Sequence, residues 1–247
     1  MKLIVAGSTG FVATEIIRQA LARPEIKSVV ALARRPTPVP DNVPAGSDVS
    51  KLKSVACDNF EEYSEGVKQA LSGADACIWT IAVTPSKVGK MQWEQVRRIC
   101  HDYSMAGLKT ISQLPHGGSS TPFRFLYVSG SNAERDPAKK PWVMGDYCLL
   151  RGETESQILA YAHQSKGTVD AAVAKPGLID APGKWGVMMK AASNVGRYLI
   201  GLPEVQVSEI AATLLDQAVN GIEKDTLLNE DLVRIGRKTL ETQKQGS

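Results

Sequence analysis

Small residues gather in one turn near the start of the chain, Gly7-Ser-Thr-Gly10-Phe-Val-Ala13. The turn follows the apolar run 3–6 and precedes a helical pattern that begins at Thr14. Such a turn lets backbone N–H groups approach a pyrophosphate, and the positive end of the following helix then faces the phosphates. This context favours a dinucleotide site over an ordinary strand-to-helix turn. The residues that we expect to line it are Gly7, Thr9, Gly10, Phe11 and Val12.

The second apolar run, 29–33, ends in Arg34 and Arg35, and no acidic residue follows before Asp41. Proteins that bind NAD usually carry Asp or Glu at this place, where the carboxylate holds the ribose 2′-hydroxyl. An arginine fork instead matches a phosphate, which a carboxylate would repel. The pair therefore predicts NADP(H), bound through its 2′-phosphate. A solvated arginine pair before a proline-rich segment is the alternative interpretation.

Strands and helices alternate along the chain. We expect strands at 3–6, 29–33, 53–57, 76–83, 125–128 and 169–174. We expect helices at 14–22, 62–71, 92–114, 145–162 and 208–220, the last capped by Ser208. This alternation predicts an α/β fold with a doubly wound, mostly parallel sheet of the Rossmann type. The interpretation is one NAD(P)-binding domain over 1–247, with a small C-terminal substrate-covering lobe at about 177–207.

Five motifs in this order resemble the atypical short-chain dehydrogenase/reductase family, with the nearest likeness to its NmrA-like and epimerase-like members common in fungi. They are the glycine turn, Arg34, Tyr127-Val-Ser129-Gly-Ser131, Tyr147 with Arg151-Gly-Glu153, and Lys175-Pro-Gly177. The resemblance covers essentially the whole chain, including 207–211 and 229–232. It is specific for the fold and much less so for a reaction.

The resemblance implies roles for several residues. Tyr147 takes the place of the family's proton donor, and Ser129 or Ser131 that of the serine that orients a carbonyl. Arg151 stands where the family has lysine. Arginine can hold the ribose and bias the phenol toward its anion, but it cannot join a lysine-type proton relay. Lys175, Pro176 and Gly177 would form the wall beside the nicotinamide.

Three further residues are candidates from their place at the ends of expected strands. Ala82 and Thr84 lie at the carboxyl end of the fourth strand, at the sheet edge where ligands meet open parallel sheets. Asp58 follows the third strand and could accept a hydrogen bond from the adenine amino group, or it could be an exposed loop acid. Trp185, Met188, Met189 and Tyr198 form an apolar segment that either covers the substrate or packs in the core.

Composition excludes several classes. A net charge of +3 with scattered basic residues argues against nucleic acid, and no apolar stretch approaches the roughly 18 residues of a membrane span. The four cysteines are far apart and the three histidines are isolated, so we expect no metal and no disulfide framework. A reducing, cytoplasmic setting is the default.

The leading hypothesis is an NADPH-dependent oxidoreductase acting on a small apolar carbonyl, enone or imine-type metabolite, with secondary metabolism as a setting. A non-catalytic NADP(H) sensor of the NmrA-like kind, or a redox-neutral isomerase or cyclase on the same fold, are the alternatives. The partner is a small-molecule substrate. The sequence leaves monomer and homodimer both open.

Overall fold

The computed structural model describes residues 1–116, 121–180 and 203–245. Its main sheet is seven-stranded and parallel, with the order β3-β2-β1-β4-β5-β6-β9. The chain runs outward from β1 through β2 to β3, then returns to place β4 on the other side of β1. This reversal confirms the predicted Rossmann-type sheet and puts a switch point between β1 and β4. The strands are β1 Lys2–Ala6, β2 Ser28–Ala33, β3 Leu52–Ala56, β4 Ala76–Trp79, β5 Phe123–Val128, β6 Val169–Lys175 and β9 Thr226–Leu228.

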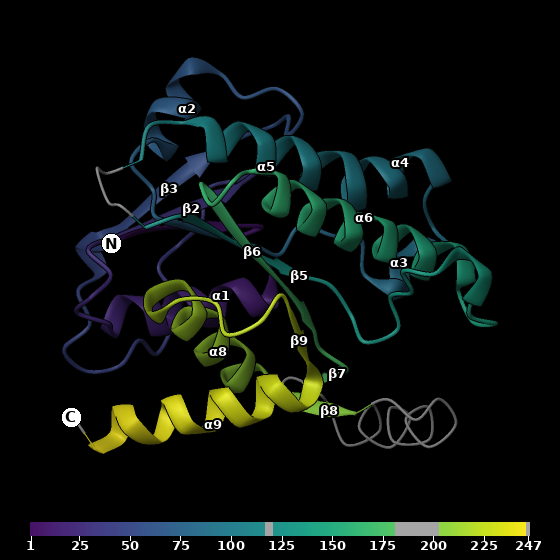
Figure 1. Ribbon diagram of the computed structural model, residues 1–247. Helices are drawn as coiled ribbons and strands as arrows, with labels where there is room; N and C mark the ends of the chain where they lie inside the picture. The colour runs from purple at the N-terminus through teal and green to yellow at the C-terminus, as the bar shows by residue number, and fades with distance from the viewer. Residues whose placement is uncertain (117–120, 181–202, 246–247) are drawn as a thin grey trace.

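Helices cover both faces of the sheet (Figure 1). On one side lie α1 Phe11–Ala22, α8 Val207–Asn220 and α9 Asn229–Gln245. On the other side lie α2 Glu65–Leu71, α4 Trp93–Arg97, α5 Tyr103–Gln113 and α6 Gly145–Gln164. Short elements, α3 Pro85–Val88, η1 Val49–Lys51 and η3 Pro137–Lys139, lie in the connections.

The sheet separates two apolar cores, and side chains alternate between them along each strand. In β1, Leu3 and Val5 pack with α1 and α8, whereas Ile4 and Ala6 pack with α5 and α6. All four are fully buried, because helices cover both faces. The continuous apolar runs in the sequence follow from this burial.

Several expected boundaries moved. The helix predicted at 92–114 consists of α4, a π-helical segment η2 (Arg98–Asp102) and α5. The strand predicted at 76–83 ends at Trp79. The cap assigned to Ser208 was wrong: Gln206 is the N-cap of α8, because its side chain and that of Glu209 form a reciprocal capping box.

The predicted substrate-covering segment lies mostly outside the described residues, and so do Trp185, Met188, Met189 and Tyr198. At its two ends, β7 Leu178–Asp180 and β8 Glu204–Gln206 form a two-stranded parallel sheet. Among the helices that the structure describes, none combines the length and the apolar character that a membrane span needs.

Candidate active site

The glycine turn joins β1 to α1 at the switch point of the sheet. Gly7 has a φ of +82°, and a Cβ there would lie 2.5 Å from the Thr80 hydroxyl oxygen. The Gly10 amide donates to the Gly7 carbonyl over 2.8 Å, which closes the turn. The two glycines therefore meet different needs: Gly7 allows a left-handed conformation in a crowded place, and Gly10 keeps the helix start free of a side chain.

The start of α1 has the character of an anion site. Its N-cap, Gly10, has no side-chain cap, and its first turn carries no acidic residue. The early amides of the helix therefore face outward with their partial positive charge uncompensated by a nearby carboxylate. Thr9 and Gly10 are exposed, while Phe11 and Val12 are half-buried. Pyrophosphate binding by these residues stays a prediction, which the absence of an acidic residue from the first turn of α1 favours.

Arg34 and Arg35 directly follow β2, and both are exposed. Neither guanidinium forms an ion pair or hydrogen bond with any residue in the part of the chain that the structure describes. Asp58 lies exposed after β3, and Ala82 and Thr84 follow β4, with Thr84 as the N-cap of α3. All of these residues lie beyond the carboxyl ends of their strands, the edge at which such sheets bind ligands.

Tyr147 and Arg151 lie four residues apart on α6, but their side chains contact different parts of the protein. The Tyr147 hydroxyl donates to the Val83 carbonyl over 2.7 Å. Arg151 is only 4% exposed and donates from Nη2 to the Val128 carbonyl over 2.7 Å. Its guanidinium carbon lies 4.8 Å from the centre of the Tyr127 ring. A cofactor can reach little of Arg151 in this arrangement, so its predicted ribose contact would require the side chain to move.

Burial and the charge of Arg151 act on the pKa of Tyr147 in opposite directions. Burial has the larger effect and raises the pKa to about 12, whereas the nearby positive charge of Arg151 lowers it, in the direction that we expected. The effect of Arg151 is too small to make the phenol acidic. At neutral pH Tyr147 is a protonated phenol, which suits a proton donor.

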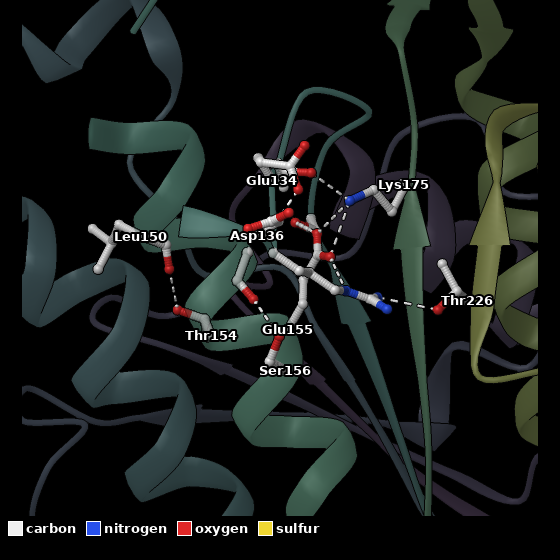
Figure 2. Close-up of polar contacts among 12 residues, drawn as sticks. Glu134, Asp136, Leu150, Thr154, Glu155, Ser156, Lys175 and Thr226 are labelled. Atoms are coloured by element: carbon white, nitrogen blue, oxygen red, sulfur yellow. Dashed lines mark hydrogen bonds and ion pairs between the residues drawn. The ribbon is translucent and has the colours of Figure 1, made fainter. Parts of the chain in front are cut away.

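A third residue of α6, the buried carboxylate Glu155, is the centre of a cluster of polar contacts that includes Lys175 (Figure 2). It lies one helical turn beyond Arg151 and is fully buried. It accepts a hydrogen bond from the Ser129 hydroxyl at 2.5 Å and from Arg135 Nε at 2.7 Å. Lys175 Nζ contacts both of its oxygens, at 3.1 and 3.0 Å. The sequence analysis missed Glu155, although the spacing of 147, 151 and 155 placed it on the same helix face.

This cluster separates the two candidate serines. The Ser129 proton is donated to Glu155, so Ser129 is not available as a donor to a substrate. Ser131 is half-buried, and its backbone amide donates to the Pro176 carbonyl over 2.8 Å. Within the described residues, its side-chain hydroxyl has no hydrogen-bond partner, so it is the serine that can donate to a substrate.

Lys175, Pro176 and Gly177, which we expect beside the nicotinamide, are connected to the Glu155 cluster through Lys175. The ammonium of Lys175 is engaged by Glu155 and by the Ala133 carbonyl, at 2.7 Å from the latter. Pro176 is buried, and the Gly177 amide donates to the Asn229 side chain over 2.8 Å. The segment is thus held in place from both sides, and its contact with a cofactor stays a prediction. Within the described residues, no group of three His, Cys, Asp or Glu side chains could hold a metal.

No family model matches the chain. A curated relative, the protein FMP52, mitochondrial, of Candida albicans, is 24% identical over 95% of this chain and 98% of its own length. The reductase domain of PhqB from Penicillium fellutanum superposes with a TM-score of 0.68 and 16% identity, over 93% of this chain and 67% of that one. DesIV, a dTDP-glucose 4,6-dehydratase from Streptomyces venezuelae solved with NAD and TYD bound, gives 0.65 and 16%, over 98% and 81%.

These neighbours show the fold of the chain. It is the Rossmann-type α/β fold that is also found in a solved reductase, a solved epimerase and a solved dehydratase. The fold that the resemblance to atypical short-chain dehydrogenases/reductases implied is therefore confirmed.

Proposed function

We propose that this protein is an NADP(H)-dependent oxidoreductase that acts on a small apolar carbonyl, enone or imine. One observation supports it most: two exposed arginines, without a partner in the described chain, lie beyond β2 where an NAD-binding protein carries a carboxylate. The start of α1 supports pyrophosphate binding beside them. NAD in the DesIV structure supports a nicotinamide dinucleotide on this fold.

In this proposal the nicotinamide supplies hydride, and the chain's own residues place the substrate and move the proton. Ser131 donates a hydrogen bond to the carbonyl oxygen, because Ser129 is committed to Glu155. Tyr147 releases the Val83 carbonyl and delivers its phenolic proton to the same oxygen. Glu155 binds both Ser129 and Lys175, and so fixes the loop after β5 relative to the end of β6.

The apolar character of the substrate is supported by the segment just before α6. Trp142 is 98% exposed, and Val143 and Met144 beside it are 47% and 37% exposed. Trp142 lies five residues before Tyr147 in the chain. Large apolar side chains that face water beside a site favour a ligand of the same character.

Cofactor titration tests the proposal. NADPH should bind at least about tenfold more tightly than NADH, equivalent to about 1.4 kcal/mol, and Arg34→Ala should erase most of that preference. Arg237→Ala is the control, since Arg237 is an exposed arginine on α9 that pairs with Glu209. Calorimetry that shows equal affinities, or a preference for NADH, would rule the cofactor assignment out.

A non-catalytic NADP(H) sensor is the second candidate, and the geometry of α6 favours it. The Tyr147 hydroxyl already donates to the Val83 carbonyl, and the Arg151 side chain is buried. Single-turnover oxidation of NADPH, with a substrate found by screening ketones and quinones, separates the two. Tyr147→Phe should slow an oxidoreductase by about 10²–10⁴ and leave NADPH affinity unchanged, whereas a sensor transfers no proton and shows no such loss.

A redox-neutral isomerase or cyclase on the same fold is a further alternative. Such an enzyme would bind NADP(H) without net oxidation, so stoichiometric loss of NADPH in the screen argues against it.

We also propose a cytoplasmic location and a role in secondary metabolism. The Candida albicans relative is named as a mitochondrial protein, and imaging of the tagged full-length chain decides between the two compartments.

A further inference from the structure

The arginine pair lies on a short bridge that is attached at both ends to the glycine turn. At the first end, the Leu32 carbonyl accepts from the amides of Gly7 and Ser8, over 2.9 and 3.3 Å. At the second end, the Ser8 hydroxyl lies 2.6 Å from the Thr37 hydroxyl. Residues 33–36 span the two attachments, and they include Arg34 and Arg35.

The second attachment is a buried one. Ser8 is fully buried and Thr37 is 9% exposed, so their hydrogen bond is shielded from water. The Thr37 amide also donates to the Ser54 hydroxyl over 2.8 Å, which ties the same point to β3. Pro36 and Pro38 flank Thr37 and fix two backbone angles there. The bridge therefore has little freedom of its own while this bond exists.

We propose that Ser8 and Thr37 are positioning residues that set the preference of this protein for NADP(H) over NAD(H). The proposal rests on the function proposed above. Because the Ser8 side chain is fully buried and its hydroxyl is bound to that of Thr37, Ser8 would act by holding Thr37, and through Thr37 the arginine bridge, at a fixed place beside the glycine turn.

The reason lies in what the two cofactors share. Both use the turn and the start of α1, but only NADPH has the 2′-phosphate that the arginines would bind. If the bridge is released, ordering Arg34 and Arg35 costs conformational entropy on binding, and that cost falls on NADPH alone. The ratio of the two affinities is thus the quantity that this contact controls.

Calorimetric Kd values for NADPH and NADH test the inference on the full chain. Ser8→Ala and Thr37→Val should each lower the ratio Kd(NADH)/Kd(NADPH) by about three- to tenfold, the worth of one hydrogen bond. The Kd for NADH should stay within about twofold. Thr37→Ser keeps the hydroxyl and should keep the ratio.

Thr213→Val is the matched control. The Thr213 hydroxyl is equally buried and donates to the Leu232 carbonyl over 2.8 Å, between α8 and α9. Its loss should lower the melting temperature to a similar extent and leave the ratio unchanged. If Ser8→Ala does not fold, the Thr37→Val and Thr37→Ser pair carries the test.

The outcomes are separable. Equal affinities in the wild-type protein would remove the proposed cofactor preference itself. A wild-type preference that Arg34→Ala erases, but that Ser8→Ala and Thr37→Val leave intact, would overturn only the present inference. Equal weakening of both cofactors would also overturn it, since the pair would then support the pyrophosphate turn alone. In the double variant Ser8→Ala/Arg34→Ala we expect no loss of preference beyond that of Arg34→Ala.

Discussion

Replacing Glu155 by glutamine keeps its volume and removes the charge that two buried or half-buried cations depend on. Lys175 is the more costly partner, because its side chain is only 11% exposed, whereas that of Arg135 is 33% exposed and water screens it. A glutamine amide also places N–H donors against the donors of Ser129 or Lys175. Breaking a buried pair from one side costs about 3–5 kcal/mol. With Arg135 partly solvated, we expect a loss near the lower end, about 3 kcal/mol.

Urea denaturation at pH 7 measures this loss as a lower free energy of unfolding. The control is Glu153→Gln, two residues earlier on α6, where an exposed carboxylate lies 3.5 Å from Arg97. Its loss should be within about 0.5 kcal/mol. The double variant Glu155→Leu/Lys175→Met should recover part of the loss, because it leaves no unpaired charge at Lys175. If Glu155→Gln costs no more than Glu153→Gln, the cluster does not stabilise the fold and our reasoning is refuted.

Two other predictions concern glycines. Gly10→Val should abolish binding of both dinucleotides while the circular dichroism spectrum stays native, because the side chain would occupy the place where a pyrophosphate approaches; normal binding would show that the cofactor lies elsewhere. Gly152→Ala should destabilise the protein by about 1–3 kcal/mol in urea denaturation, since a Cβ there would lie 1.8 Å from the Glu134 carbonyl oxygen and force the loop off α6. An unchanged midpoint would mean that this close approach is absent in solution.

The sheet and the glycine turn could be predicted because their signals are local. Leu3–Ala6 reads as a buried strand, and the small residues that follow identify the turn at its end. The shared helix face of Tyr147 and Arg151 follows from their spacing alone. By contrast, β9 has only three residues, Thr226–Leu228, and its place in the sheet comes from pairing with β6. A strand so short carries no periodicity that would reveal it.

The surroundings of the site residues could not be predicted, because they depend on segments far apart in the chain. Ser129 and Ser131 are equivalent by motif, and only the carboxylate of Glu155, 26 residues further on, separates them. Nothing in the sequence around Thr37 indicates that its hydroxyl meets that of Ser8. The cap of α8 shows the same limit at short range: Ser208 is the better cap by residue type, but Gln206 and Glu209 together satisfy two amides.

Arginine in place of lysine at position 151 has a consequence for the direction of the proposed reaction. A planar guanidinium can stack on the Tyr127 ring and donate to the Val128 carbonyl, and this draws the charge into the protein and away from a ligand. The burial of Tyr147 outweighs the charge of Arg151 and raises the pKa of Tyr147 to about 12. Reduction uses the proton that Tyr147 already holds, so its rate should not change with pH between 6 and 9 on account of this residue. Oxidation of the alcohol needs the phenolate, which at pH 8 is about one molecule in 10⁴, and its rate should rise about tenfold per pH unit. Initial rates in both directions, compared with those of Tyr147→Phe, measure this asymmetry; an oxidation rate that levels off near pH 7 would mean that the phenol is acidic in the working enzyme.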